Sequence, residues 1–512
     1  MQNSVNHMRR RLLGSGLALP AVAMSASAHA TETANIRWDR EFEVIVVGSG
    51  IAGTVAAIRS AEEGAQTVVI EKLGRLGGTS RFSGLNFACV GSEAQKAAGV
   101  KDTPEALAND MARVSGGLGN YELALFMAQN TARAEKFYRD HGVEWDGRLL
   151  KLGGHSAKRC LVSKGDGAGL LNKLWESARK LSKLSFRTNV KLDEIVRDEK
   201  TGRVLGIKVR EDYVFDRAVE NDDLVNKTGR VAYWKAKKAV IMATGGFSRD
   251  RQFRRIEVPF LDGVSTTTSP GATAGALKAM INIGARAVHV CLYRFAYPIP
   301  TEDMIWGIMI DPSTGKRFMS EGETRNSLAT AVLQLRLKNG DKKPFMIYDK
   351  KALSKFHNAN RVQRSLNGLN GRNGTMYTFN TIEEIAAFYE TDAKTVRKSM
   401  EDYNKKIAKG NDPDFEKPMM RSDRRVETID MTGPFYCIEV TPRLNYTPGG
   451  VRIDKSARVL DLESDKPIPG LYAAGEATGG LHGQERMTAC SMPDCSVYGI
   501  IAGEMAAKEP IC

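Results

Sequence analysis

Short apolar runs recur along the chain and predict buried strands. Within each run β-branched and other apolar residues follow one another, without the polar alternation of a half-buried strand. This pattern is typical of strands covered on both faces of a parallel sheet. Between the first two runs, Ala52–Glu62 predicts a helix. The expected fold class is therefore α/β, with strands at Phe42–Val47, Thr67–Ile70, Ala239–Met242 and Leu471–Ala474.

A glycine-rich turn joins the first strand to this helix. Glycines in the pattern GxGxxG allow a tight turn, a close approach to a pyrophosphate and close packing of helix on strand. The helix N-terminus would face the pyrophosphate, and an acid roughly 20 residues further on can bind a ribose hydroxyl. A glycine-rich turn of another α/β protein is the alternative. The ordered set predicts a dinucleotide site that includes Gly48, Gly50, Ile51, Ala52, Gly53, Glu71 and Lys72.

Two more glycine-bearing segments extend the predicted cofactor site. The loop from Gly74 to Ala88 follows Glu71 directly, so its backbone N–H groups can approach phosphate or flavin oxygens. The strand at Ala239–Met242 also runs into glycines, which suggests that one nucleotide is held from two directions. The candidates from these segments are Gly77, Gly78, Thr79, Ser80, Ser83, Gly84, Ala243, Thr244 and Gly245.

The remaining pattern predicts ordinary helices and strands. Thr103–His141 and Ile382–Lys406 are expected to be helical, and Leu184–Val196 is expected to be a strand. A polar loop holds His155 and Arg159, which either reach a ligand or belong to a solvated loop.

Composition excludes several classes of site. The 512 residues include 74 Lys and Arg against 60 Asp and Glu, for a formal charge of +14. These basic residues are scattered and not interleaved with aromatics, which favours a solvated surface over nucleic-acid binding. Such a field can still steer an anionic substrate or an acidic electron-transfer partner. The seven cysteines form neither a CxxC pair nor a CxxCH haem site, so we expect no haem and no metal.

Residues 1–30 have the features of a cleaved export signal. Arg9, Arg10 and Arg11 precede a modest apolar run, and Ala28-His29-Ala30 is a small-residue cleavage pattern. The adjacent arginines favour the twin-arginine route over an ordinary Sec signal. No other stretch is long and apolar enough for a membrane helix. The expected location is the periplasm.

Seven motifs follow one order along nearly the whole mature chain. They are VVGSGIAG at 46–53 with Glu71, GGTS at 77–80, ATGGF at 243–247, SPGATAGALKAMINIGA at 269–285, GKRFMSEGETR at 315–325, NYTPGGVRID at 445–454 and IPGLYAAGEATGGLHGQER at 468–486. This set resembles the flavoproteins of the fumarate reductase and succinate dehydrogenase superfamily, and among them the flavocytochrome c-type fumarate reductases, with the haem domain absent.

The resemblance implies two domains. A Rossmann-type FAD-binding domain would comprise residues 38–297 and 421–512, and an inserted α+β clamp domain, residues 298–420, would close over the substrate. Gly475 and Glu476 would contact FAD. A C-terminal helix over Asp494–Ala506 would direct its N-terminus, near Ser491 and Met492, at the flavin. No histidine adjoins the loop at 74–80, which favours non-covalent FAD.

The resemblance also implies catalytic residues. Family reductases deliver hydride from flavin N5 to an alkene polarised by a clamped carboxylate. Arg325 matches the arginine assigned as proton donor, and Arg486 matches a carboxylate-binding arginine. A guanidinium normally stays protonated, so Arg325 needs a proton relay or acts electrostatically. Tyr446 matches a residue that donates a proton or orients the substrate. Asn445 replaces a family histidine and can donate a hydrogen bond but carry no charge.

Two further departures affect the expected substrate. The family's second clamp histidine is replaced within Tyr297–Pro300, and the Glu and Arg that feed protons to the catalytic arginine have no full counterpart. Glu302 or Asp303 can substitute for part of that relay. Tyr297 and Trp306 suggest a larger, more aromatic pocket, although both can equally be core. We therefore expect an α,β-unsaturated acid with one carboxylate and a bulkier tail, and not fumarate itself.

Three functions compete at this stage. The first is an exported, FAD-dependent reductase of an unsaturated organic acid that serves as a respiratory electron acceptor, with a separate cytochrome or membrane electron donor. The second is a dehydrogenase of ketosteroid or tricarballylate type, which runs in the oxidative direction. The third is a non-catalytic flavin electron carrier. The exact substrate, the direction, the electron donor and the oligomeric state stay open.

Overall fold

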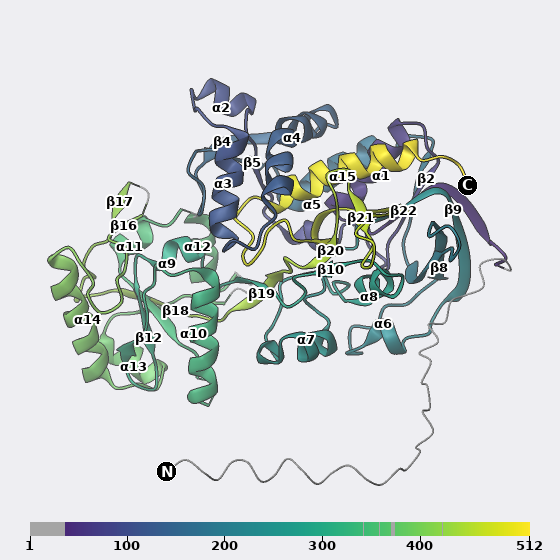
Figure 1. Cartoon of the computed structure of the whole chain (residues 1–512). Coiled ribbons are helices and arrows are strands. Elements are labelled where there is room, and N and C mark those ends of the chain that lie inside the picture. The colour runs from purple at the N-terminus through teal and green to yellow at the C-terminus, as the bar shows by residue number, and fades with distance from the viewer. Residues whose placement is uncertain (1–35, 341, 358, 370–373, 422) are drawn as a thin grey trace, which may run out of the picture.

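The computed structural model describes residues 36–340, 342–357, 359–369, 374–421 and 423–512. The predicted export signal, residues 1–30, lies outside these described residues. Figure 1 shows two groups of elements, one built around the long sheet near the C-terminus and one containing β12, β18 and helices α9–α14. In the part of the chain described, no helix is both long and apolar enough to cross a bilayer.

A mostly parallel sheet lies at the centre of the first group and confirms the predicted α/β class. Its order is β21-β22-β9-β1-β2-β6, in which only β21 is antiparallel to its neighbour. The residues of β2 and the last residues of β1 and β9 are fully buried, as their continuous apolar runs predict. The strands are β1 (Arg40–Val47), β2 (Thr67–Ile70), β6 (Leu184–Arg187), β9 (Arg230–Met242), β21 (Arg458–Leu460) and β22 (Pro467–Ala473).

Helix α1 (Ile51–Glu62) packs along α15 (Ser491–Lys508), so an early and a late segment of the chain lie side by side (Figure 1). Two glycines of α15 make this packing possible. A Cβ on Gly499 would lie 2.9 Å from the carbonyl oxygen of Ala52, and one on Gly503 would lie 2.4 Å from that of Ala56. The absence of side chains there brings α15 directly against α1.

The predicted strand Leu184–Val196 is wrong in one respect, because it is two strands. β6 ends at Arg187, and β7 (Lys191–Arg197) pairs antiparallel with β8 (Val204–Glu211), which in turn pairs with β9. Asn189 causes the break: its φ of +57° lies in the left-handed region, which asparagine tolerates better than most residues. The turn brings Val190 close to Glu71, whose carbonyl accepts the Val190 N–H at 3.0 Å.

The helical stretch predicted from Thr103 to His141 is likewise two helices, α3 (Pro104–Val114) and α4 (Tyr121–Asp140). Gly116 and Gly117 adopt positive φ between them. Asn120 then caps α4 by accepting the N–H of Leu123. These helices lie near a small sheet of β3 (Asn86–Ala88), β5 (Cys160–Ser163) and β4 (Trp145–Leu150), with α2 (Glu93–Ala97) and α5 (Asp166–Ala178).

The second group is built on a five-stranded sheet of order β13-β12-β14-β18-β15. Most of this sheet comes from one continuous segment, but β18 (Phe435–Glu439) returns from later in the chain to pair with β14. The predicted helix Ile382–Lys406 is interrupted, and Asp392 caps the second part. The other elements are β12 (Ile308–Asp311), β13 (Lys316–Arg317), β14 (Phe345–Tyr348), β15 (Tyr377–Phe379), α9 (Thr301–Met304), α10 (Arg325–Lys338), α11 (Lys350–Ser354), α12 (Ala359–Leu366), α13 (Ile382–Phe388) and α14 (Ala393–Ala408).

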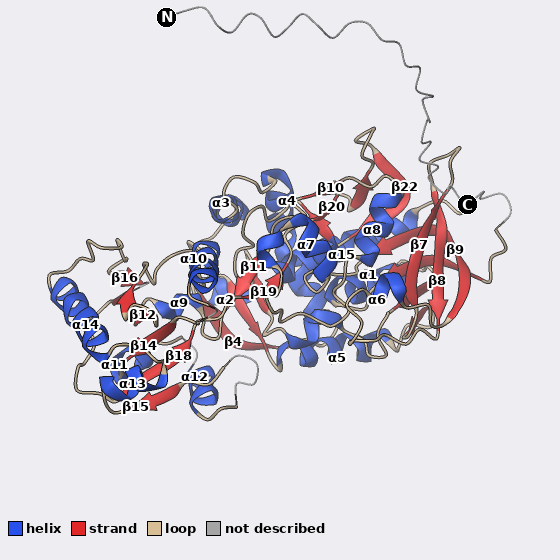
Figure 2. Ribbon diagram, turned by 90° about the horizontal axis from the view of Figure 1, so that it is seen from below, coloured by secondary structure: helices blue, strands red, loops and turns tan. Residues whose placement is uncertain are grey.

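Short strands connect the two groups. β11 (Arg294–Ala296) pairs antiparallel with β19 (Arg443–Tyr446), and Figure 2 shows this pair between the two groups. Beside it lie β10 (Ala287–Val288), β20 (Gly450–Arg452) and β23 (Thr478–Gly479), which form a three-stranded sheet. The remaining elements are α6 (Asp222–Val225), α7 (Arg251–Glu257), α8 (Gly275–Asn282), β16 (Met420–Arg421) and β17 (Arg424–Arg425).

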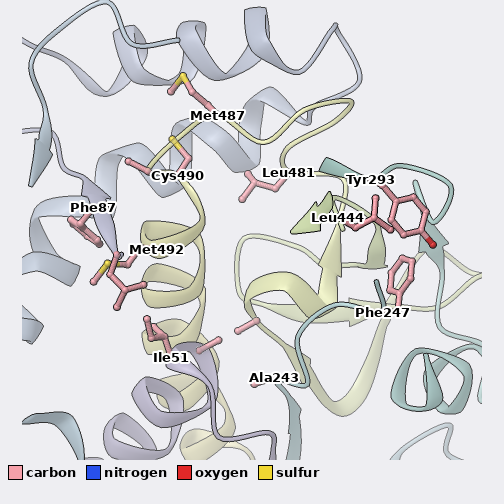
Figure 3. Packing of buried hydrophobic residues seen from close by; sticks show 14 of the residues in the cluster. Ile51, Phe87, Ala243, Phe247, Tyr293, Leu444, Leu481, Met487, Cys490 and Met492 are labelled. Atoms are coloured by element: carbon pink, nitrogen blue, oxygen red, sulfur yellow. The ribbon is translucent and has the colours of Figure 1, made fainter. Parts of the chain in front are cut away.

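One hydrophobic core contains residues from both early and late segments of the described chain. Figure 3 shows Ile51, Phe87 and Met492, from three separate elements, lying together beside the start of α15. All three are buried. The N-terminus of α15 is therefore fixed by packing, which matters because it borders the candidate site.

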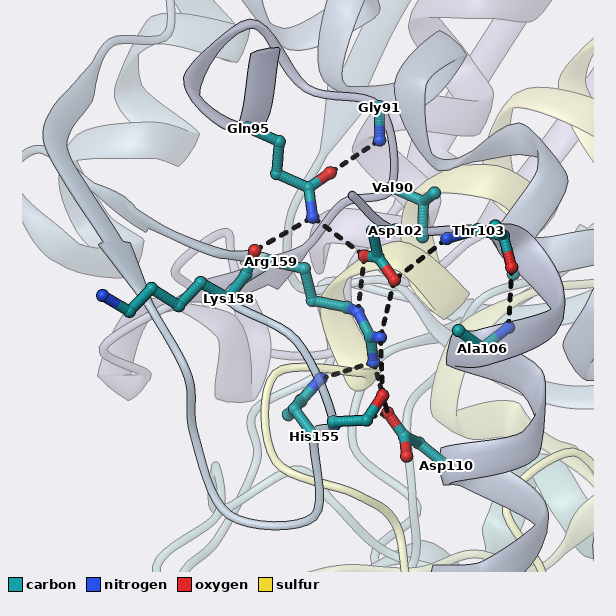
Figure 4. A network of polar contacts seen from close by, with 12 residues as sticks. Val90, Gly91, Gln95, Asp102, Thr103, Ala106, Asp110, His155, Lys158 and Arg159 are labelled. Atoms are coloured by element: carbon teal, nitrogen blue, oxygen red, sulfur yellow. Dashed lines mark hydrogen bonds and ion pairs between the residues drawn. The ribbon is translucent and has the colours of Figure 1, made fainter. Parts of the chain in front are cut away.

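A buried polar network lies beside this core (Figure 4). Arg159 is fully buried and donates to both carboxylate oxygens of Asp102 at 2.8 Å and to Asp110 at 2.6 Å. His155 donates through Nε2 to the carbonyl of Thr488 at 2.7 Å. Burial lowers the pKa of His155 to about 4, so the ring is neutral at pH 7. His155 and Arg159 thus belong neither to a solvated loop nor to a ligand site: they hold the 486–490 segment in place.

We expect Arg159→Met to lower the free energy of unfolding of the holoprotein by roughly 3–5 kcal/mol, because it leaves the buried Asp102 carboxylate without its cation and Asp110 with only the largely exposed Arg113. Denaturant unfolding followed by circular dichroism measures this loss. Lys164→Met is the control, since Lys164 pairs with Glu144 on the surface and both side chains are largely exposed. A loss in Arg159→Met no larger than in this control would contradict the prediction.

Candidate active site

The carboxyl ends of β1, β9 and β22 surround a cavity that collects most of the predicted cofactor residues. Ligands bind at this end of the strands in open α/β sheets. Its lining includes Gly48, Gly50, Ile51, Ala52, Glu71, Gly78, Thr79, Ser80, Ala243, Thr244, Gly245 and Glu476. Segments more than four hundred residues apart in sequence therefore meet in one cradle.

Three predicted glycines shape the cradle because they have no side chain. Gly48 has a φ of +103°, and a Cβ there would lie 2.4 Å from the carbonyl oxygen of Ala243. A Cβ on Gly53 would lie 1.9 Å from the carbonyl oxygen of Gly48, and one on Gly475 would lie 2.9 Å from the Cβ of Ala52. These positions allow strand, turn and helix to approach one another. Gly77, with a φ of +108°, donates its N–H to Ser49 Oγ at 2.9 Å.

Glu71 is buried at the edge of this cradle. Ser49 donates to its Oε2 through Oγ at 2.6 Å, and the Leu73 N–H donates to its Oε1 at 3.0 Å. Lys72 lies further out, where its Nζ contacts Asp223 at 3.0 Å and Thr273 Oγ1 at 2.6 Å. Because Lys72 is occupied by these partners, its geometry favours a structural contribution to the cofactor site.

A second cavity, with a mixed polar and apolar lining, continues from Glu71 and includes Lys72. Val190, Lys191 and Leu192 line it, together with Val47 and Ala276. Sequence reasoning missed these three residues as candidate cofactor contacts, because it placed them inside an uninterrupted strand. The break at Asn189 was the available signal, since it turns this segment toward the cradle.

A third cavity, of about 740 Å³, opens from the other end of the cradle. It shares Ile51, Thr79, Ser80 and Glu476 with the cradle, and it adds Ser83, Gly84, Ser491 and Met492 from the predicted set. Ser491 and Met492 begin α15, so the positive end of that helix borders this cavity.

These three spaces fit FAD. The pocket beside Glu71 combines apolar walls such as Val190 and Leu192 with polar groups, which suits an adenine and its ribose, and the glycine cradle suits a pyrophosphate. A Cβ on Gly78 or Gly245 would meet no atom within 4 Å, so their backbone borders open space. The 740 Å³ cavity can take the flavin ring and a substrate together. FAD bound here would meet backbone N–H groups, the acid Glu71 and the α15 N-terminus.

Arg486 is a buried arginine that lines the large cavity. It is only 9% exposed, and its Nη1 donates to the Met487 carbonyl at 3.0 Å. Its guanidinium lies 4.6 Å from the ring centre of Tyr446. Within the described ranges, no carboxylate lies in ion-pair distance of Arg486, and its Nε has no hydrogen-bond partner. A buried cation in this state is suited to binding an anionic ligand.

Asn445 and Tyr446 flank this arginine. Asn445 Oδ1 accepts from Arg294 at 3.3 Å, which leaves the Asn445 amide N–H₂ available to the cavity. Tyr446 donates to Asp494 Oδ2 at 3.3 Å, and burial raises the pKa of Tyr446 well above its usual value. Of the two predicted roles of Tyr446, this geometry favours orientation over proton donation.

Arg325 lies behind Tyr297 at the start of α10. Its Nη2 contacts both carboxylate oxygens of Glu302, at 2.9 and 3.1 Å, and its Nε lies 3.6 Å from Glu485. The Tyr297 hydroxyl donates to the Arg325 carbonyl at 2.6 Å. Although burial alone would raise it, the pKa of Glu302 is held at about 2 by Arg325 and nearby cations. The structure thus pairs Glu302, one of the two predicted relay substitutes, with Arg325.

Asp303 and Trp306 have other roles. Asp303 pairs with His357 Nδ1 at 2.7 Å. Trp306 is buried, with Lys355 Nζ 5.4 Å from its ring centre, and belongs to the core of the second group. Tyr297 instead lines the large cavity, as the aromatic-pocket hypothesis requires.

Sequence reasoning missed several arginines of the large cavity, among them Arg361 and Arg443. Arg361 comes from α12 and donates to the carbonyls of Tyr297 at 2.9 Å and Pro298 at 2.7 Å. Neither arginine belongs to a recognisable motif, so only the fold reveals them. In the described part of the chain, no group of three His, Cys, Asp or Glu side chains is placed to hold a metal ion.

Fold and site together define an FAD-dependent oxidoreductase. The chain belongs to the FAD binding domain family, whose model matches residues 43–492. It is 33% identical to the acrylate reductase flavoprotein subunit of Shewanella woodyi over 96% of this chain and 95% of that relative. It is 32% identical to the urocanate reductase of Eggerthella lenta, over 91% and 75%.

Among solved structures, the open conformation of a flavocytochrome c3 fumarate reductase superposes with a TM-score of 0.75. The sequences are 26% identical, and the match covers 92% of this chain and 79% of that one. The comparisons confirm the predicted fumarate reductase-like flavoprotein class and FAD as its cofactor. The roles of individual site residues stay predictions.

Proposed function

We propose that this protein reduces the C=C bond of an α,β-unsaturated monocarboxylic acid. The observation that carries the proposal is Arg486, a buried guanidinium that lines the large cavity without a carboxylate partner among the described residues. A substrate carboxylate would supply the missing charge. The names of the two reductase relatives, for acrylate and urocanate, support this substrate class.

In this mechanism Arg486 and the Asn445 amide bind the carboxylate and polarise the adjacent alkene. FAD, when bound, supplies the hydride to one alkene carbon through flavin N5. Arg325 does not line the large cavity in this structure, so closure of its segment would bring it to the substrate, where it stabilises the developing charge and delivers a proton to the neighbouring carbon. Glu302, in contact with Arg325, provides a route for replacing that proton. The Arg325–Glu302 pair thus supplies the relay that a lone guanidinium lacks.

The cavity supports a substrate other than fumarate. Asn445 is neutral where the family's fumarate reductases carry a histidine, so this end of the clamp binds a second carboxylate less well. Tyr297 adds an aromatic wall to a cavity of about 740 Å³. A monocarboxylate with a bulkier tail needs only one cationic contact and would fill more of this cavity than fumarate.

We further propose that residues 298–420, joined by β18, act as a clamp over the large cavity. Arg325, Glu302 and Arg361 all come from this segment, so its position would control both chemistry and access. Export through the twin-arginine route, non-covalent FAD and respiratory use with a separate cytochrome or membrane donor complete the proposal.

The test is anaerobic oxidation of reduced methyl viologen by the purified holoprotein. Fumarate, acrylate, cinnamate and urocanate would be compared as acceptors. We expect one monocarboxylate to exceed fumarate in kcat/KM by roughly 10–100-fold, the discrimination that one pocket typically supplies. Silence with all four acids would overturn the proposal. Dye reduction by saturated acids or ketosteroids would instead indicate the oxidative direction, and bound FAD without either activity would indicate an electron carrier.

A further inference from the structure

A second arginine-rich cavity, of about 650 Å³, lies beside the active site. It is lined by Arg249, Arg251, Arg254, Gly263, Val264, Ser265, Thr266 and Arg443. Apart from Arg443, which also lines the large cavity, none of these residues belongs to the cofactor or catalytic set derived above. Four of the eight lining residues are arginines, and the lining contains no carboxylate. Its chemistry is therefore that of an anion site.

Arg254 is the strongest evidence that this cavity takes a ligand. The side chain is 2% exposed, and its Nη1 donates to the carbonyls of Leu261 at 3.1 Å and Val264 at 2.7 Å. Its Nε has no hydrogen-bond partner among the described residues, and none of their carboxylates is in ion-pair distance. Thr266 Oγ1 is buried and equally without a partner in that part of the chain. Burying a cation without an anion destabilises the folded protein unless an anionic ligand binds to that cation.

The two cavities are separated by very little protein. Arg443, at the start of β19, lines both of them. Thr266 lines the arginine cavity, and its neighbour Thr267 lines the large one. Leu444 bonds across this wall, because its N–H donates to Ser265 and its carbonyl accepts from Thr267, both at 2.9 Å. One layer of backbone with the Arg443 side chain forms the boundary.

The rim of the cavity is already neutralised, in contrast to its interior. Arg251 pairs with Glu220 and Asp262, and so does its neighbour Arg255. Arg255 does not belong to the lining. The charge available to a ligand is thus that of Arg254, together with the hydrogen-bonding capacity of the surrounding side chains. This arrangement fits a small anion and not a broad acidic protein surface.

We propose that this cavity captures carboxylate anions and passes them to the active site past Arg443. The inference rests on the proposed function for the identity of the anion, an unsaturated carboxylate. Anion binding by the cavity itself does not depend on that function. A site of this kind raises the local substrate concentration next to the flavin cavity.

The first test measures binding without turnover. Sulfate is titrated calorimetrically, at constant ionic strength, into holoprotein that carries Arg486→Gln, which removes the active-site anion contact. We expect sulfate to bind to this variant. Adding Arg254→Gln should raise the dissociation constant of sulfate at least about 10-fold, since a hydrogen bond to a charged group contributes about 1.5–3 kcal/mol. Arg255→Gln is the matched control, because it removes the same charge one residue along α7. No binding, or equal effects of both substitutions, would overturn the proposal.

The second test measures turnover of the best enoate substrate in the otherwise unchanged enzyme. Arg254→Gln should raise KM about 5–10-fold and change kcat less than two-fold, because capture precedes the chemical step. Arg249→Gln, a second lining residue, should act in the same direction if Arg254→Gln fails to fold. Unchanged KM in both would overturn the capture role. Loss of sulfate binding in an enzyme that reduces no enoate would leave the anion site standing while the proposed function fails.

Discussion

Arg325→Gln is expected to retain FAD and to lower kcat by about 10³-fold, the loss typical of removing a charged transition-state contact or a general acid. The glutamine can still donate a hydrogen bond, but it cannot stabilise developing negative charge or pass on a proton. Viologen oxidation measures kcat, and the flavin absorbance of the purified protein measures FAD content. Arg325 lies outside the three cofactor spaces, so the two readouts should separate.

Two companion substitutions sharpen this experiment. Lys338→Gln, at the exposed end of the same helix α10, should leave kcat unchanged. Arg325→Lys keeps the charge but loses the planar guanidinium, whose Nη2 contacts Glu302 while its Nε faces Glu485, so it should recover little activity. A kcat within ten-fold of the parent enzyme in Arg325→Gln would exclude Arg325 from the chemical step.

Arg486→Gln is expected to lower kcat/KM by about 10²–10³-fold, because breaking a buried charge-assisted contact costs about 2–5 kcal/mol. In contrast to Arg159→Met, this substitution should not destabilise the holoprotein in the absence of substrate. Arg486 has no carboxylate partner among the described residues, so its loss leaves no buried carboxylate unpaired. We also expect a bound saturated acid to shift the visible spectrum of the flavin in the parent enzyme, and this shift should be lost in Arg486→Gln.

The control for this substitution is Arg458→Gln, which removes an arginine paired with Asp454 at 2.7 Å and distant from the cavity lining. Its kcat/KM should match that of the parent enzyme. If Arg486→Gln changed kcat/KM less than three-fold, the substrate carboxylate would have to bind elsewhere in the large cavity, and Arg361 and Arg443 would become the first candidates.

The parts of the site that the sequence predicts are those encoded locally. The strand, glycine turn, helix and acid from Phe42 to Glu71 need no tertiary information, because each element constrains its neighbour within a few residues. The sequence analysis expects a C-terminal helix over Asp494–Ala506 with its N-terminus near Ser491, and α15 begins at Ser491. Residues such as Gly53 and Gly475 follow from the same motifs, and their tight contacts explain why glycine stands there.

The unpredicted parts depend on contacts between distant segments. Arg361 and Arg254 lie on short helices without motifs, and only the fold shows that each of them lines a cavity. The break at Asn189 escapes a pattern based on hydrophobicity, because one residue in the left-handed region changes the path without changing the apolar run. The sequence names Glu302 as one of two substitutes for part of the proton relay, and only the tertiary structure shows that it contacts Arg325.

The adjacency of α1 and α15 also has a consequence for biosynthesis. Glu476 and Ser491, which border the cofactor spaces, are synthesised more than four hundred residues after Gly48. A nascent polypeptide can therefore fold its early strands on the ribosome, but it cannot complete the FAD cradle before Ser491 has been translated. A chain truncated before these residues would lack the stabilisation that bound FAD supplies and would be more exposed to proteolysis.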